Sequence, residues 1–309
     1  MPRFDVTIAG ELNLDLILYG LPERLPRERE LLAERMMLTL GSSSAILAHN
    51  LAALGSRVGL QSLIGDDQLG RMAEERLARS GVDTSLVRRT GKSQTGISII
   101  LQHGAWRNIL TYPGTITQLT MQDLDLHYLA DSRHFHFSSF YLQGGLRPHV
   151  ADLFQQLRGA GLTTSLDTND DPDDQWGDLR DVLHHVDVFL PNQREACKIT
   201  GTEDCMLALE KLSKIVPVVV IKLGKEGAIG HRDGQTIHAP ALQVDAVDPV
   251  GAGDSFDAGF LHQYVRGADL AGCLTWGNLA GALSTTRCGG TEAFRDREHC
   301  EKFFQQHCG

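Results

Sequence analysis

Short apolar runs alternate with amphipathic stretches along most of this 309-residue chain. The runs are rich in Val, Ile, Leu and Phe and are mostly apolar on both faces, as buried parallel strands are. They lie at residues 6–9, 58–64, 134–139, 163–166, 186–190 and 216–223. Helical periodicity marks the stretches between them, including 67–80, 147–160 and 193–201. This alternation predicts an α/β fold with a mostly parallel sheet covered by helices on both faces.

Two segments break this alternation. Residues 16–40 contain prolines and dense charge, and residues 95–114 predict a β-hairpin with arms at 96–102 and 108–112. We expect these segments to form a small β-sheet lid, within a single domain of residues 1–309.

Composition narrows the classes of partner. The chain has 29 basic and 39 acidic residues, a formal net charge of −10, which disfavours nucleic-acid and membrane partners. No apolar run approaches the roughly 18 residues of a membrane span, and the N-terminus lacks signal-peptide features. Six cysteines form no C-x-x-C pair, so we expect reduced thiols and a cytoplasmic protein.

The segment DPVGAGDSFDAGF at residues 248–260 carries the most chemistry. Gly251, Ala252 and Gly253 precede an amphipathic helix, and small residues at a helix start leave N–H groups open to an anion. Asp254 stands at the same helix start, where a carboxylate can take a proton from an alcohol during phosphoryl transfer. We expect hydrogen bonds and the helix dipole to keep Asp254 ionised at neutral pH. The alternative is that Asp254 is an ordinary helix N-cap.

This segment resembles the C-terminal signature of the ribokinase-like (PfkB) family of carbohydrate kinases, and the resemblance spans nearly the whole chain. It implies a ribokinase-like fold and ATP-dependent phosphorylation of a sugar or sugar-like alcohol, with ATP and Mg²⁺. It also implies that Asp254 is the catalytic base and that Gly251, Ala252, Gly253 and the Asp254 backbone form the anion hole. Acceptors in the family include ribose, fructose, 2-keto-3-deoxygluconate, phosphorylated hexoses and nucleosides, and the sequence does not choose among them.

Further segments match the family at the nucleotide side. Asn192 and Glu195 resemble its N-x-x-E motif, in which the Glu acts on Mg²⁺ through water, although the same pair also predicts a helix capping box. Lys222, Gly224 and Gly227 resemble the nucleotide-site turn, with a plain tight turn as the alternative. Asn278 matches a position near the adenine. A monovalent-cation loop, which would bind K⁺, is matched by Asp248 and the carbonyls of Val250, Ser284, Arg287 and Gly289.

Polar residues at predicted strand ends suit the acceptor. Asp15 and Asn13 follow the first strand, where the family uses the Asp to bind sugar hydroxyls. Asn169 follows another strand and is a further candidate for substrate contact. Arg107 lies at the lid turn, where it either reaches the substrate or is a solvated charge.

The turn at Gly41, Ser42 and Ser43 resembles the first family signature but departs from it. Ile46 stands where the family has an Asn, and Ile46 cannot form that hydrogen bond. Either Asn50, one helical turn later, does other work or the sugar lacks this contact.

The sequence also leaves two alternative functions open. Gly253, Asp254 and Ser255 with His299 resemble GDS-type serine esterases, which would use Ser255 as nucleophile but carry this block near the N-terminus. A non-catalytic sugar or nucleotide sensor on the same fold is expected to have lost Asp254 or a glycine of the turn. Exposed strand edges in the lid would also allow a homodimer.

Overall fold

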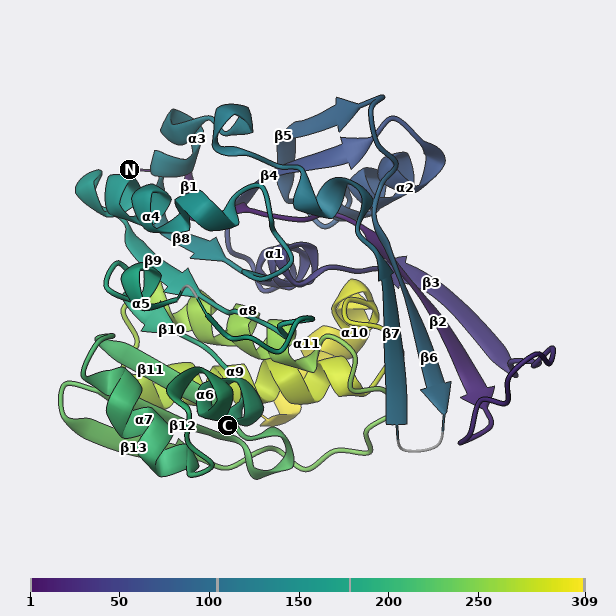
Figure 1. Ribbon diagram of the computed structural model, residues 1–309. Helices are drawn as coiled ribbons and strands as arrows, with labels where there is room; N and C mark the ends of the chain where they lie inside the picture. The colour runs from purple at the N-terminus through teal and green to yellow at the C-terminus, as the bar shows by residue number, and fades with distance from the viewer. Residues whose placement is uncertain (1, 104–105, 178, 308–309) are drawn as a thin grey trace.

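The computed structural model describes residues 2–103, 106–177 and 179–307. Its larger sheet has nine strands in the order β13-β12-β11-β10-β9-β8-β1-β4-β5 (Figure 1). Only the pairs β11–β12 and β12–β13 are antiparallel among these described strands. The strands are β1 (Phe4–Ala9), β4 (Val58–Gly65), β5 (Asp83–Thr90), β8 (Ser132–Phe137), β9 (Thr163–Leu166), β10 (Val188–Phe189), β11 (Val218–Lys222), β12 (Ala228–Arg232) and β13 (Gln235–Ala239). The predicted mostly parallel α/β sheet is confirmed.

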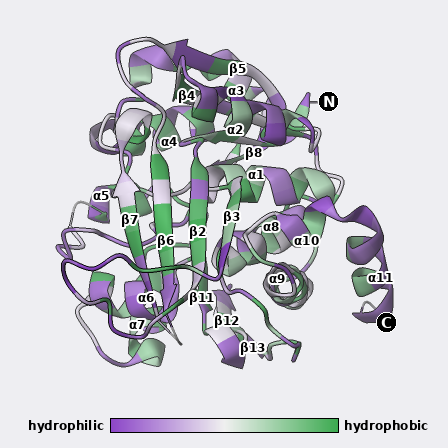
Figure 2. Cartoon of the chain, turned by 90° about the vertical axis from the view of Figure 1, so that its right-hand side faces the viewer, coloured by the Kyte–Doolittle hydropathy of each residue, from purple (hydrophilic) through white to green (hydrophobic). Residues whose placement is uncertain are grey.

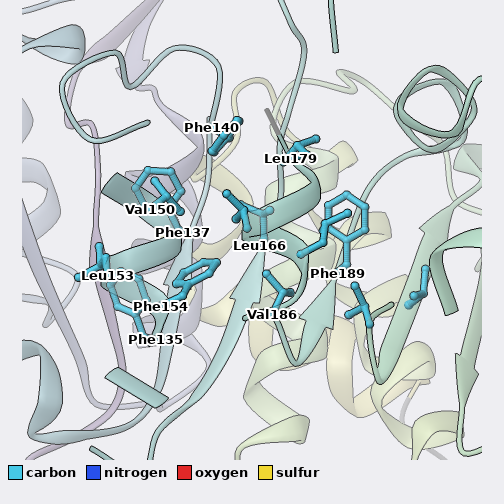
Figure 3. Packing of buried hydrophobic residues seen from close by; sticks show 14 of the residues in the cluster. Phe135, Phe137, Phe140, Val150, Leu153, Phe154, Leu166, Leu179, Val186 and Phe189 are labelled. Carbon is cyan, nitrogen blue, oxygen red and sulfur yellow. The ribbon is translucent and has the colours of Figure 1, made fainter. Parts of the chain in front are cut away.

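Helices cover both faces of this sheet, because most strands are apolar on both sides. One core contains Phe135, Phe137 and Phe154 and lies under α3 to α7 (Figure 3). The other core contains Val6 and Ile8 and lies under α1, α2, α8 and α9. The helices are α1 (Ser43–Ala53), α2 (Gln68–Ala78), α3 (Leu126–Ala130), α4 (Val150–Gly159), α5 (Arg180–Leu183), α6 (Gln193–Thr200), α7 (Cys205–Ser213), α8 (Ala252–Tyr264), α9 (Leu270–Thr285), α10 (Glu292–Arg295) and α11 (Arg297–His307).

A separate sheet of four strands has the order β3-β2-β6-β7. It consists of β2 (Leu14–Leu21), β3 (Arg35–Leu40), β6 (Ile97–His103) and β7 (Trp106–Tyr112). This sheet stands beside the main body and confirms the predicted lid (Figure 1). The predicted hairpin turn includes residues 104–105, which lie outside the described residues.

Some local predictions need correction. The run at 186–190 forms a strand of only two residues, and β5, β12 and β13 were not predicted. His134 and His136 alternate with phenylalanines on β8, and the polar face that they form is buried, with hydrogen bonds to Ser165 at 2.6 and 2.7 Å. Burial lowers the pKa of each histidine to about 3. Across the described residues, none of the helices has the length and apolarity that a bilayer crossing requires.

Candidate active site

The Gly-rich turn begins helix α8. Gly251 is the N-cap with φ 72°, and a Cβ there would lie 2.5 Å from the Gly290 Cα, so both the backbone and the space require glycine. Gly253 is exposed, and a Cβ there would meet only the Lys222 ammonium, at 3.6 Å. Among the described residues, the N–H groups of Gly253 and Asp254 have no backbone acceptor. Free donors at a helix start form an anion site.

Asp254 lies at this helix start and is 9% exposed. Its carboxylate accepts hydrogen bonds from the Ser43 hydroxyl and, at 3.4 Å, from Asn169 Nδ2. It does not cap the helix, so the N-cap alternative is wrong. Burial first, and then the charge of Asp167, raise the pKa of Asp254, with Lys222 opposing. This direction is opposite to the one expected from the helix dipole, because the sequence does not reveal the burial.

A chain of hydrogen bonds connects Asp254 to a buried carboxylate that the sequence reading missed. Asn169 Oδ1 accepts from the Ser139 N–H at 2.8 Å, and the Ser139 hydroxyl donates to Glu11 Oε1 at 2.8 Å. The Ser44 hydroxyl donates to Glu11 Oε2, also at 2.8 Å. Burial raises the pKa of Glu11. An acid directly after an apolar strand, in the segment GELNLD, was the available signal.

Asp15 lies at the base of the lid against the turn that precedes α1. A Cβ on Gly41 would lie 2.1 Å from Asp15 Oδ1, so this glycine gives the carboxylate its place. Burial, and then the charges of Asp254, Asp248 and Glu11, raise the pKa of Asp15 to about 7.

The rest of this turn is structural as well as polar. Ser42 is the N-cap of α1: its hydroxyl accepts from the Ala45 N–H at 3.1 Å and donates to the Glu11 carbonyl at 2.8 Å. Asn13 is buried and donates to the neighbouring Leu14 carbonyl at 3.2 Å.

Ile46 and Asn50 answer the question raised by the departure from the first signature. Ile46 is buried and packs beneath the Gly-rich turn, about 3.4 Å from where a Gly251 Cβ would lie. Asn50 Nδ2 donates to Ser255 Oγ at 2.9 Å and to the Gly290 carbonyl at 3.0 Å. Asn50 therefore joins α1 to the start of α8, which is other work than binding an acceptor.

Lys222 lies beside the start of α8 in a buried ionic cluster. Its ammonium contacts Asp167 Oδ2 at 2.7 Å and both oxygens of Asp257, at 3.1 and 3.0 Å. Burial acts against the charge, but Asp167 and Asp257 raise the pKa of Lys222. Lys222 was predicted to contact the nucleotide, whereas this geometry commits its ammonium to carboxylates. Its nucleotide role stays a prediction.

A cleft of about 550 Å³ opens beside this cluster, lined by residues that include Asn192, Lys222 and Gly224. Asn192 and Glu195 form the predicted capping box of α6, in which the Asn192 N–H donates to Glu195 Oε2 at 2.8 Å. Burial, and then the charge of Asp167, raise the pKa of Glu195 to about 8.

Asn192 and Glu195 suit an Mg²⁺ ion that they contact through water and not directly. Both Glu195 oxygens already accept hydrogen bonds from Asn192. No group of three or more metal-ligating side chains exists in the described part of the chain. Mg²⁺ is commonly held by one or two carboxylates, waters and substrate phosphates, so this arrangement suits it.

Three predicted residues lie apart from the cluster around Asp254. Gly227 has φ 97°, and a Cβ there would lie 2.1 Å from the Ala239 carbonyl. Asn278 Nδ2 donates to the same carbonyl at 2.9 Å, so both residues fasten the chain after β13. Arg107 is exposed on β7. The ligand contacts assigned to these three residues stay predictions.

Comparison with known proteins identifies the family. The profile of the pfkB family carbohydrate kinases matches residues 4–297. The chain belongs to this family. The pfkB kinase is 31% identical over 294 residues to the ATP-dependent ribose-1-phosphate kinase of Halopiger xanaduensis, covering 93% of this chain and 94% of that one. It is 29% identical to the 2-dehydro-3-deoxygluconokinase of Bacillus subtilis, covering 85% and 86%.

The fold agrees with solved structures of pfkB-like kinases. An E. coli chain crystallised with ATP and Mg²⁺ superposes with a TM-score of 0.85 at 23% identity, covering 98% of this chain and all of that one. The predicted ribokinase-like fold is confirmed, and the pfkB kinase is a sugar kinase.

The esterase alternative does not agree with the geometry of this pfkB kinase. Ser255 is fully buried, and its hydroxyl donates to the Gly251 carbonyl at 2.7 Å. His299 Nε2 lies 2.8 Å from Thr286 Oγ1 and is not paired with Ser255. A serine nucleophile needs both access and a neighbouring base.

Proposed function

We propose that this pfkB kinase transfers the γ-phosphoryl group of ATP to a hydroxyl group of an uncharged sugar or polyol. One observation carries the proposal: the Asp254 carboxylate lies at the free N–H groups of the α8 start, beside Asn169 and Asp15. An acceptor hydroxyl at Asp254 would meet a phosphoryl group held by those N–H groups.

The residues divide the chemistry between them. Asp254 takes the proton of the attacking hydroxyl. The loose transition state of phosphoryl transfer allows this proton to leave late. The N–H groups of Gly253 and Asp254 stabilise charge on the transferring phosphoryl group. Mg²⁺, held by the phosphates and through water by Glu195, would supply further neutralising charge. Asp15 accepts hydrogen bonds from the remaining hydroxyl groups of the acceptor, and Asn169 donates hydrogen bonds to them.

The charges around the acceptor favour a neutral molecule. Glu11, Asp15 and Asp254 are all buried here, and the charges that act on the pKa of Asp15 are all carboxylates. On β6, Ser98 pairs with Asp15 and Gln102 pairs with Arg107. The four residues from Ser98 to Gln102 span roughly 13 Å along the strand, so Arg107 lies far from Asp15. A phosphate or carboxylate on the acceptor would therefore face the negative charge of these carboxylates. The acceptors named for the two relatives above are anionic, so we expect this chain to differ from them.

A panel of acceptors tests the function. ATP-dependent ADP release would be measured with ribose, 2-deoxyribose and fructose, and with ribose-1-phosphate and 2-keto-3-deoxygluconate. We expect kcat/KM for the best neutral acceptor to exceed that for the anionic acceptors by about 100-fold. This ratio corresponds to a difference of roughly 2.7 kcal/mol in activation free energy. A preferred anionic acceptor would contradict the charge argument while leaving the kinase assignment intact.

Asp254→Asn is the matching variant. We expect it to bind ATP and acceptor as the wild type does and to lose about two or more orders of magnitude in kcat, because the base is gone. Asp269→Asn is the control, since Asp269 caps the neighbouring helix α9 and Asn caps equally well. Near-normal turnover in Asp254→Asn would remove Asp254 as the base.

The lid also supports association with a second copy of this chain. One lid face, which we call the lid outer face, consists of apolar residues that are half-buried or exposed: Leu16, Leu18, Met36, Ile99, Leu101 and Leu110. Figure 2 shows these lid strands as a largely hydrophobic sheet. Apolar surface of this kind is typical of interfaces. We expect a homodimer through this face.

A further inference from the structure

Asp248 lies where the Gly-rich turn meets the loop that follows α9. Its side chain is fully buried. Oδ1 accepts from the Val250 N–H and Oδ2 from the Gly289 N–H, both at 3.0 Å. The carboxylate therefore connects the two loops on which the shape of the anion site depends. This is also the position at which the family resemblance implies a monovalent cation.

A third donor occupies the carboxylate. The hydroxyl of Tyr19, on lid strand β2, donates to Asp248 Oδ2 at 2.6 Å. Three donor hydrogens thus converge on one carboxylate, and a cation there would face their partial positive charges. The Ser284 carbonyl, an expected cation ligand, already accepts the Thr286 N–H that ends α9.

The surroundings of Tyr19 are apolar and hold its ring in place. Tyr19 packs in a buried cluster with Ile17, Ile100, Val250 and Cys288. The Arg35 guanidinium lies 4.3 Å from the ring centroid and donates to Cys288 Sγ at 3.0 Å. The oxygen that the side chains of this cluster present to Asp248 is the Tyr19 hydroxyl, which is already committed to the carboxylate, and a K⁺ ion needs several oxygen ligands to replace its water shell. With the Tyr19 hydroxyl on Asp248, the residues here do not fit a bound monovalent cation.

We propose that the Tyr19 hydroxyl takes the place of the cation at Asp248, so that this chain works without K⁺. The hydroxyl satisfies the carboxylate that fixes Val250 and Gly289, which is what a bound cation would otherwise do. Tyr19 is a positioning residue, because it acts on the anion site through Asp248. Since Tyr19 belongs to β2, the same bond ties the lid to the Gly-rich turn.

The wild-type protein tests the first half of this proposal. Thermal unfolding and turnover would be measured in about 100 mM KCl and in tetramethylammonium chloride at equal ionic strength, because a bound cation stabilises the folded state. We expect the same Tm in both salts and turnover that differs less than about twofold. Activation by K⁺ of about fivefold or more, or a Tm several degrees higher in K⁺, would overturn the proposal.

Tyr19→Phe tests the second half, because it removes the hydroxyl and keeps the ring. Without K⁺ we expect a lower Tm and turnover reduced about tenfold, since a buried carboxylate loses a donor. K⁺ should then raise both quantities in the variant, which it does not in the wild type. Tyr112→Phe, at an exposed lid tyrosine, is the control and should match the wild type in both salts.

Two outcomes with the variant would contradict the exchange of hydroxyl for cation. One is wild-type Tm and turnover in Tyr19→Phe without K⁺. The other is a destabilised variant that K⁺ leaves unchanged. The thermal measurements need no acceptor, so they decide the question even if the proposed transfer reaction fails.

Discussion

Individual residues of the site owe their properties to burial more than to their neighbours along the chain. Acidic residues are usually exposed, yet Asp15 is only 6% exposed. The charges of three other carboxylates also raise its pKa. A carboxylate so placed retains a proton well above its ordinary range. Under the proposed function, in which Asp15 binds the acceptor, its protonation is linked to acceptor binding.

Acceptor binding should depend on pH through Asp15. Below pH 7 the protonated carboxyl accepts fewer hydrogen bonds from sugar hydroxyls, and above pH 7 the carboxylate accepts them fully. We expect the acceptor KM to fall about tenfold from pH 6 to pH 8, as one group with a pKa of about 7 requires. Asp15→Asn should raise the KM and flatten this profile. A pH-dependent KM that persists in Asp15→Asn would assign the titration to another group.

We expect Lys222 to stabilise the folded protein, whether or not it also contacts ATP. Lys222→Met leaves Asp167 and Asp257 buried without their shared cation, which we expect to cost about 3–5 kcal/mol in the free energy of unfolding. Adding Asp257→Asn should recover part of the loss, because one buried charge disappears. Denaturant unfolding measures both, with Lys225→Met at the exposed neighbour as control. Wild-type stability in Lys222→Met would show that the cluster is not coupled as described.

At the scale of elements, the start of α8 contains two glycines whose surroundings differ: the fold requires glycine at one of the two positions and not at the other. Gly251 is required by its backbone conformation and by the approach of Gly290. Gly253 has an ordinary φ, and a Cβ there would make only ordinary van der Waals contact with Lys222, so nothing in the fold requires glycine. Close approach of a phosphate to Gly253 stays a prediction of the proposed function.

Alanine at each glycine should separate these reasons. Gly251→Ala should lower Tm, since the positive φ alone costs about 1–2 kcal/mol and the Gly290 backbone cannot yield. Gly253→Ala should keep the wild-type Tm but lower kcat by roughly 100-fold, because its methyl group displaces phosphate from the N–H donors. Calorimetry and ADP release measure the two effects. Full activity in Gly253→Ala would contradict an anion site at this turn.

At the scale of the whole molecule, the four-stranded sheet has two apolar faces. The face with Ile17, Tyr19 and Ile100 is buried against the loops around Asp248. The lid outer face has no described element packed over it in a comparable cluster, and Met36 and Leu110 are 63% and 54% exposed. We therefore expect a second copy of this chain to cover the open apolar face.

Oligomeric state tests this arrangement. We expect the wild type to sediment as a dimer at micromolar concentration and Leu110→Lys to shift toward monomer, because a charge in an apolar interface is costly. Leu32→Lys is the control, since Leu32 is 82% exposed and lies outside the lid strands. A monomeric wild type would remove the proposed dimer.

Features carried by contiguous residues were readable from the sequence. The strand and helix alternation, the Asn192 and Glu195 capping box and the Gly-rich turn depend on local spacing, and the structure contains them. Polar, exposed strands such as β13 were missed because their pairing partners, not their own pattern, stabilise them.

The contacts that set the chemistry were decided by the tertiary structure alone. Tyr19 and Asp248 are 229 residues apart in the chain, and Glu11 and Ser139 are 128 apart. Such contacts, and the burial that raises the pKa of Asp254, exist only once the sheets and helices have packed. Spacing along a chain encodes which elements form. Burial and long-range contact are properties of their assembly, and they control the charge of each carboxylate.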